Sequence, residues 1–257
     1  MDQELIIQNQ ETAVVIKQNK FKSLAEEAFE AEENESTGQF INISGGMLMV
    51  GGQPIAGNKI RCIILDFIHE NVYYPGKFSR TNLEPPTCFA FGRTDKNLIP
   101  HDSISAPVFE ECDTCPNNEF GTSQHSEKAK ACKNTRRLAL LPAGDADLTV
   151  DKIRSNDVKY FRLPVTSVKV FSAYVKALSV ALELPPAGVI TEIGLMPDAK
   201  NQFKVVFTQI GEIDAVAPEI VDAVLQRNQE QRKLISFPYT PKKQVKAEPT
   251  ESTNDKF

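Results

Sequence analysis

The sequence has little that would suit it for a membrane or for export. No apolar run in its 257 residues approaches the length of about twenty that crosses a bilayer. The first ten residues, MDQELIIQNQ, show no basic segment followed by an apolar stretch and a small-residue cleavage site, so we expect no secretory signal. The sequence therefore predicts a protein of the cytoplasm, without a membrane partner, where thiols stay reduced.

The motifs of hydrolytic and nucleotide chemistry are also missing. The chain has no HExxH sequence, no clustered aspartate and histidine residues, and no glycine-rich loop ending in Lys-Ser or Lys-Thr. These absences argue against a metal-dependent nuclease or another hydrolase, and we predict that the protein is not an enzyme. The net charge of -5 also means that only a local basic patch could attract nucleic acid.

Composition and local pattern divide the chain into three parts. Hydrophobic residues at 41% and charged residues at 25% fit a globular protein with a core of useful size. Residues 1–37 form an acidic N-terminal segment, with six glutamates between positions 25 and 36. The main domain spans 38–237. Residues 238–257 have almost nothing to bury and contain three prolines, so we expect a flexible tail.

The main domain is predicted to be α+β and mainly β. Short β-rich runs bounded by Gly, Pro and Asn cover 39–74 and 87–92, and strands resume in RRLALLP and KYFRLPV. About forty residues after the strand at 87–92 show no regular period. The most secure helix is TSVKVFSAYVKALSVALEL, with Thr166 or Ser167 as its cap and an apolar stripe at Val168, Phe171, Val175, Leu178 and Leu182. A hairpin around MPDAKN and a second helix starting near Pro218 follow.

The five cysteines predict a metal site within the irregular region. Cys62 lies in an apolar strand and is expected in the core. Cys112 and Cys115 form a Cys-x2-Cys pair, a spacing that lets two thiolates meet one tetrahedral ion, and Cys132 is a third ligand. An odd number of cysteines in a reducing compartment favours metal over disulfides. Structural zinc suits this sulfur ligation and would order a loop that has no core of its own.

The fourth ligand is left open by the sequence. We favour Cys88, because it stands where the irregular region begins and would tie the start of the loop to its middle and end. His125 is the next candidate, and His101 is a further one. A closed four-ligand site has no open position for chemistry, so we expect a structural role for the metal.

A basic run follows the cysteines. Five positive charges fall within ten residues that contain no acid, at Lys128, Lys130, Lys133, Arg136 and Arg137. Some of this charge would offset a zinc tetrathiolate, but not all five residues are needed for that. The run is therefore a candidate for holding phosphates.

A second candidate surface follows the strand IRCIILDFIHENVYY. Aromatic residues alternate there with basic ones, at Tyr73, Tyr74, Lys77, Phe78 and Arg80. Aromatic rings beside positive charges suit a binder of single strands without sequence preference, because every base has a face that can stack. Aromatics packed inside a sheet are an equally good interpretation for any one of them.

The order of these parts resembles the single-stranded DNA-binding proteins of bacteriophages related to the T7-type helix-destabilising protein. The resemblance covers roughly residues 39–215 and is carried by IRCIILDFIHENVYY, CDTCPNNEFGT with KAKACKNTRRLALLP, and LPVTSVKVFSAYVKAL with GVITEIGL. It implies an OB-fold-like barrel with flanking helices and, here, a zinc-bound insertion at about 88–135. It also implies a protein that coats single-stranded DNA in phage replication or recombination, in the host cytoplasm, with a tail ending in Phe257 that binds replication proteins.

An alternative function belongs to another class. The chain could be a zinc-stabilised accessory protein that docks on a polymerase and does not bind DNA itself. Binding to oligonucleotides separates the two hypotheses.

Overall fold

The structure, a computed structural model, describes residues 39–76, 85–124, 126–144, 148–213 and 217–239. The described residues form two compact units, each built from separate stretches of the chain. Unit 1 takes its residues from 1–69 and 135–235, and unit 2 takes its residues from 70–134 and 236–257. The predicted acidic segment and the tail beyond position 239 lie outside the described residues.

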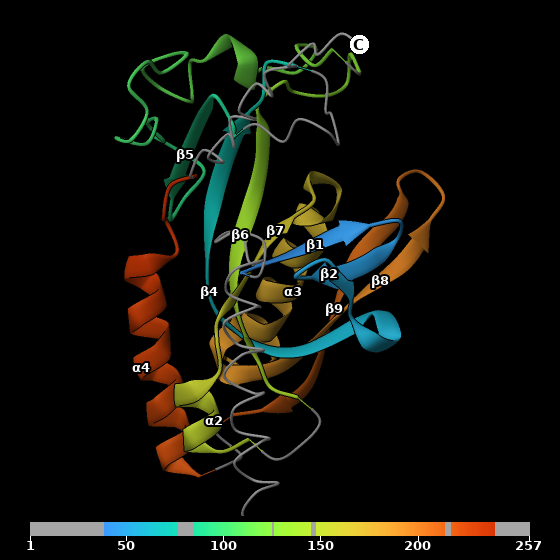
Figure 1. Cartoon of the computed structure of the whole chain (residues 1–257), viewed down its shortest axis with the longest axis vertical. Helices are drawn as coiled ribbons and strands as arrows, with labels where there is room; N and C mark the ends of the chain where they lie inside the picture. Colours follow the sequence, from blue (N-terminus) through green and yellow to red (C-terminus); the bar gives the residue numbers. More distant parts are fainter. Residues whose placement is uncertain (1–38, 77–84, 125, 145–147, 214–216, 240–257) are drawn as a thin grey trace, which may run out of the picture. The chain divides into compact units, whose positions relative to one another are not determined.

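Unit 1 is built on one mixed β-sheet (Figure 1). The strand order is β3-β2-β1-β7-β6-β4-β8-β9, and β1 runs antiparallel to β2 but parallel to β7. The sheet is curled into a half-barrel, and the curl brings β2 into contact with β8, which lies five places away in the strand order. The strands are β1 Phe40–Ser44, β2 Met47–Val50, β3 Gln53–Pro54, β4 Lys59–Tyr73, β6 Lys133–Pro142, β7 Lys159–Leu163, β8 Val189–Asp198 and β9 Gln202–Glu212.

Helices cover both faces of the central strands of unit 1. Figure 1 shows α3 and α4 on opposite sides of β4 and β6, with the short α2 beside α4. Both β4 faces are therefore buried, and its sequence is a near-continuous apolar run instead of an alternating one. The α-helices in the described part of the chain are α2 Val150–Ser155, α3 Val168–Ala181 and α4 Pro218–Leu234, and short 3-10 turns occur at Ala56–Asn58, Val165–Ser167 and Pro186–Gly188.

The core of unit 1 lies between the concave face of the sheet and α3. Phe171 of α3 is buried there and meets Phe67 edge-to-face, with 5.0 Å between ring centroids. Cys62 and Ile64 of β4 belong to the same cluster. Cys62 has none of its surface exposed, and burial raises the pKa of its thiol, as expected for a core cysteine. The prediction that Cys62 is a core residue is confirmed.

The predicted helices and hairpin are confirmed, with one difference in how α3 begins. Ser167 occupies the N-cap position of α3, but its hydroxyl accepts a hydrogen bond from the Val205 amide at 3.0 Å in place of a helix amide. Pro218 stands in the first turn of α4, where its missing N–H costs nothing. Helix α2 was not predicted, although Thr149 caps it by accepting from the Lys152 amide.

Unit 2 is mostly irregular. Strand β5, Cys88–Gly92, pairs with the end of β4, where the Thr87 amide donates to the Tyr73 carbonyl oxygen at 3.0 Å. The described residues between β5 and β6 contain a 3-10 turn at Pro116–Asn118 (η2) and two isolated bridges, but no strand or α-helix. The predicted forty-residue stretch without regular period is confirmed.

The fold class is confirmed at the level of a mainly β, α+β protein. Among the described residues, no helix combines the length and apolarity that a bilayer crossing requires.

Candidate metal and nucleic-acid site

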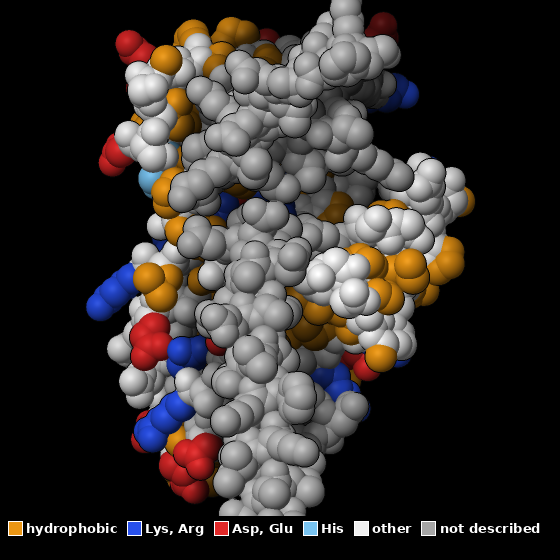
Figure 2. All heavy atoms as spheres, in the orientation of Figure 1, with side chains coloured by type: hydrophobic (Ala, Val, Ile, Leu, Met, Phe, Trp, Pro, Cys, Tyr) orange, Lys and Arg blue, Asp and Glu red, His pale blue; other side chains and the backbone are white. Residues whose placement is uncertain are grey.

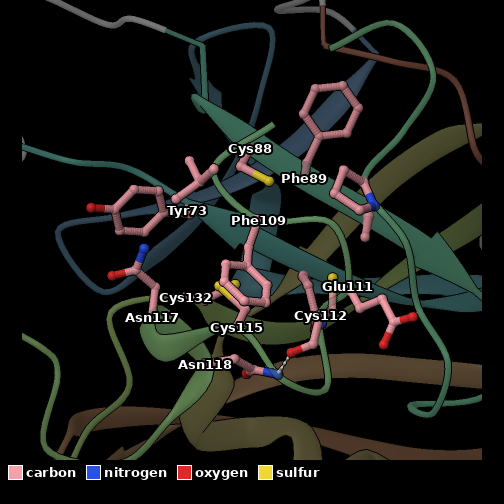
Figure 3. A pocket seen from close by; sticks show the side chains of 14 residues that line it. Tyr73, Cys88, Phe89, Phe109, Glu111, Cys112, Cys115, Asn117, Asn118 and Cys132 are labelled. Carbon is pink, nitrogen blue, oxygen red and sulfur yellow. Dashed lines mark hydrogen bonds between the residues drawn. The ribbon is translucent and has the colours of Figure 1, made fainter. Parts of the chain in front are cut away.

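Four cysteines line one small cavity in unit 2 (Figure 3). Cys88 comes from the first position of β5, Cys112 and Cys115 come from the loop before η2, and Cys132 immediately precedes β6. The cavity has a volume of about 20 Å³, close to the space for a single water-sized sphere. The structure thus brings together the three cysteines of the loop and the cysteine favoured as the fourth ligand.

Four cysteine thiols are suitable ligands for zinc, although their sulfur atoms are not arranged around a common centre. Within the described residues, no group of three or more His, Cys, Asp or Glu side chains is arranged to hold a metal ion. Tetrahedral ligation places each sulfur about 2.3 Å from the ion. Binding by all four thiolates would therefore require the side chains to move toward a common centre. All four cysteines are free thiols, so the sulfurs are available for this movement.

Burial and mutual repulsion raise the pKa of three of these thiols, those of Cys88, Cys112 and Cys132. Burial is the largest cause of the raised pKa of Cys132, about 12, and the negative charges of the neighbouring thiolates raise it further. Burial also raises the pKa of Cys88 and Cys112. A divalent cation would reverse the repulsion, because a bound thiolate shares its charge with the metal.

Asparagine side chains connect the loop around the cysteines. Asn118 donates from Nδ2 to the Cys112 carbonyl oxygen at 2.7 Å, and its Oδ1 accepts from Lys130 Nζ at 3.2 Å (Figure 3 shows the first bond). Asn134 donates to Asn118 Oδ1 at 2.9 Å and to Asn71 Oδ1 at 2.6 Å. The Asn71 side chain is itself hydrogen-bonded to the Cys112 thiol. This network fixes the backbone around Cys112 from both sides.

The two histidine alternatives for the fourth ligand are placed differently. His101 stacks on Phe89 with 5.3 Å between ring centroids, and its Nδ1 is hydrogen-bonded to Ser103 Oγ at 2.9 Å. It does not line the cysteine cavity. His125 lies outside the described residues. The placement of Cys88 on the cavity wall therefore supports it over His101.

One lysine of the basic run lies over an exposed phenylalanine. Phe120 has 76% of its surface exposed, and the ammonium of Lys130 lies 5.2 Å from its ring centroid. Phe120 and Lys130 also form an antiparallel bridge. Lys128 is exposed in the same loop, and Lys133 is exposed at the first position of β6. Phe120 was missed by the sequence reasoning, and the signal that could have found it is a lone aromatic in a stretch with no apolar period to bury it.

The two arginines of the basic run belong to unit 1. Arg137 has none of its surface exposed and donates from Nη1 to the Ile235 carbonyl oxygen at 3.1 Å. Arg136 is half-buried and donates to the Thr135 carbonyl oxygen at 2.9 Å. A fully buried guanidinium cannot reach a phosphate. Arg137 is therefore not among the residues that we propose for nucleic-acid binding.

The second predicted surface is described only in part. Tyr73 is half-buried and lines the cysteine cavity, whereas Tyr74 is 41% exposed. Lys77, Phe78 and Arg80 lie outside the described residues. The sequence-based grouping of these five residues therefore stays a prediction.

An aromatic cluster in unit 2 was also not predicted. Tyr239 packs against Phe89, with 4.9 Å between ring centroids, and against Phe91 at 6.5 Å. Its hydroxyl donates to Oε1 of the buried Glu70. Tyr239 was assigned to the flexible tail, but its ring is part of the packing of unit 2.

An exposed apolar surface lies on unit 1. Figure 2 shows hydrophobic side chains gathered over the β1-β2 and β8-β9 hairpins. Met47 at the start of β2 and Met196 in β8 are each about half exposed. Among the described residues, no exposed aromatic-lysine pair lies on this surface.

Comparison with known proteins gives no relative. No family model matches the sequence, no curated protein matches it, and no solved structure matches its fold.

Proposed function

We propose that this protein binds single-stranded DNA without sequence preference and catalyses no reaction. The observation that carries the proposal is the exposed Phe120 ring with Lys130 beside it, together with the exposed Lys128 of the same loop and Lys133 at the start of β6. An aromatic ring offers a stacking surface to any base, and each nearby lysine can neutralise one phosphate. The role in phage replication or recombination rests on the resemblance described above.

The exposed ring of Phe120 contributes little to folding and is accessible to a base. Burying a phenylalanine contributes about 1.5–3 kcal/mol to folding, and Phe120 gives up most of this contribution. Base stacking on an aromatic side chain is worth about 1–3 kcal/mol per base. Lys130, held by Asn118, stands where it could meet the phosphate of the stacked nucleotide.

We also propose that Cys88, Cys112, Cys115 and Cys132 hold one structural zinc ion. Their shared cavity and the lack of a hydrophobic core in the loop support this set. When bound, zinc would supply a closed tetrahedral link between β5, the loop before η2 and the start of β6. The chain's own contribution is to bring four thiols to one cavity and to brace one of them, Cys112, with Asn71 and Asn118.

The curled sheet of unit 1 supports an OB-fold-like classification. The half-barrel encloses a core capped by α3, and β2 contacts β8 across it. The zinc-bound insertion would then correspond to the irregular residues of unit 2. The proposed partner-binding role of the tail ending in Phe257 rests on the resemblance alone, since that segment lies outside the described residues.

The proposal is tested by binding of fluorescent oligo-dT at several salt concentrations. We expect the wild type to bind, with affinity falling as salt rises, because phosphate contacts release counterions. Phe120→Ala should weaken binding by about five- to 150-fold, which is the loss of one stacked base. Ile99→Ala is the matched control, because Ile99 is another exposed apolar residue of unit 2, with 61% of its surface exposed.

Two results would overturn the proposal. The first is no binding of oligo-dT by zinc-loaded wild type, which would favour the accessory protein that docks on a polymerase. The second is an affinity that does not change with salt, because a complex held by phosphate contacts must be weakened by added counterions.

A further inference from the structure

One side chain connects the cysteine cavity to the exposed ring of Phe120. Asn118 is the last residue of η2, the turn that starts directly after Cys115. Its Nδ2 donates to the Cys112 carbonyl oxygen, and its Oδ1 accepts from the Nζ of Lys130. The same Nζ lies over the Phe120 ring. Three described contacts therefore run in series from a cysteine of the cavity to the nucleic-acid surface.

The backbone makes the same connection by a second route. The Cys132 amide donates to the Asn117 carbonyl oxygen at 2.8 Å, so the cysteine that precedes β6 is tied to η2. The Asn118 amide in turn donates to the Cys115 carbonyl oxygen at 2.9 Å. The backbone of Cys115 and of Cys132 is thus hydrogen-bonded to η2, so a metal that holds these two cysteines together would also restrain the turn between them.

We propose that metal binding by the four cysteines and single-stranded DNA binding at Phe120 and Lys130 are energetically coupled through Asn118. This inference rests on the proposed function. Drawing the cysteines together fixes η2, and fixed η2 holds Lys130 beside Phe120 through Asn118 Oδ1. Because zinc has already ordered this surface, DNA binding no longer has the entropic cost of ordering it, and the apparent affinity for DNA is higher.

Thermodynamic linkage makes the coupling reciprocal. If zinc raises the affinity for DNA by some factor, DNA must raise the affinity for zinc by the same factor. Typical couplings between two sites correspond to about five- to 150-fold, and we expect a factor within this range. Because this equality holds for any coupling mechanism, the route through Asn118 is tested by how the factor changes when Asn118 is replaced.

The experiment measures both affinities in the full chain. Zinc affinity is measured against a colorimetric chelator with and without saturating oligo-dT, and oligo-dT affinity is measured with and without zinc. The wild type is compared with Asn118→Asp, which keeps the acceptor for Lys130 but loses the donor to the Cys112 carbonyl. Asn117→Ala is the control, because the described bonds of Asn117 use its backbone carbonyl oxygen.

The expected result is the same coupling factor in both directions for the wild type and Asn117→Ala. In Asn118→Asp we expect one equivalent of zinc, measurable binding of oligo-dT, and a factor that falls toward one. An unchanged factor in Asn118→Asp would overturn the inference. This is the result expected if zinc acted only by keeping unit 2 folded, because the coupling would then not depend on Asn118. Equal oligo-dT affinity with and without zinc in the wild type overturns the coupling but leaves the proposed function standing. No oligo-dT binding in either state overturns the proposed function as well.

Discussion

In unit 1, the guanidinium of Arg137 donates a hydrogen bond to the carbonyl oxygen of Ile235 at 3.1 Å. Ile235 is the C-cap residue of α4, where backbone carbonyls lack a partner within the helix and carry its negative dipole end. Arg137 also lies with its guanidinium carbon 5.8 Å from the centroid of the Phe40 ring. A residue that the sequence suggested for DNA is thus part of the packing between β6 and α4.

Replacing Arg137 should therefore destabilise the fold without acting on DNA directly. We expect Arg137→Ala to lower the free energy of unfolding by about 2–4 kcal/mol, because it removes a charged hydrogen bond and leaves a buried cavity. Arg136→Ala, at the half-buried neighbour, should cost less than about 1 kcal/mol. Urea denaturation measures both. Weaker oligo-dT binding by folded Arg137→Ala, with unchanged stability, would contradict this assignment.

The lysines of unit 2 should set the salt dependence of DNA binding. Each lysine that neutralises a phosphate contributes about 0.7 to the slope of log affinity against log salt for single strands. We expect Lys128→Ala and Lys133→Ala each to reduce the slope by about this amount. Lys59→Ala is the control, because Lys59 of unit 1 pairs with Glu192 at 2.8 Å. A slope reduced equally by Lys59→Ala would show that general charge, not the loop, determines binding.

Zinc content should separate Cys62 from the other four cysteines. We expect one equivalent of zinc in the wild type by elemental analysis, and one equivalent in Cys62→Ala, since Cys62 lies in the core of unit 1. Cys132→Ser should lose most of its zinc, because serine provides no soft thiolate ligand. A full equivalent retained by Cys132→Ser would exclude this residue from the ligand set and reopen the candidacy of His125.

Tyr239 should stabilise unit 2 through both its ring and its hydroxyl. Tyr239→Phe keeps the contacts with Phe89 and Phe91 but removes the hydrogen bond to the buried Glu70, and we expect a loss of about 1–3 kcal/mol. Tyr239→Leu should cost more, because it also removes the aromatic contacts. Hydrogen exchange of the β5 amides measures the effect locally. Equal protection in the wild type and both variants would show that Tyr239 does not contribute to unit 2.

The regular elements of this protein could be predicted because their apolar patterns are periodic. Phe171 and Leu178 stand two turns apart in α3 and are both buried, and Pro218 marks the start of α4. The N-cap position of Ser167 was also predictable. Its bond to the Val205 amide was not, because that contact is set by the packing of β9 against the 3-10 turn that precedes the helix.

The burial of Arg137 could not be predicted from local pattern. Leu138 and Leu140 face the core that contains Phe171, so Arg137 must point to the opposite face of β6. That face is covered only because α4, almost a hundred residues later in the chain, packs on it. The candidate site divides in the same way. Cysteine spacing grouped Cys112, Cys115 and Cys132, which line one cavity, whereas Phe120 lies in a loop whose path no periodicity determines.

The turn of the β8-β9 hairpin should weaken at low pH. Asp198 accepts hydrogen bonds from the backbone amides of Asn201, at 2.9 Å, and Lys200, at 3.0 Å, and these bonds hold the pKa of its carboxyl below the usual value of 3.8. The folded state therefore favours the ionised form of Asp198. The stability that this carboxylate gives to the turn is fully present above pH 3.8, and it is lost as the pH falls through the lower pKa of the folded protein.

Carbon-detected NMR titration of the Asp198 carboxyl tests this directly. We expect a midpoint below 3.8 in the wild type and only a small upward change in Asn201→Ala, because the two backbone amides remain and lower the pKa more than the Asn201 side chain does. A return to the ordinary value in Asn201→Ala would mean that the side chain, not the backbone of the turn, determines this pKa. A normal midpoint in the wild type would mean that the turn does not adopt this hydrogen-bonded form in solution.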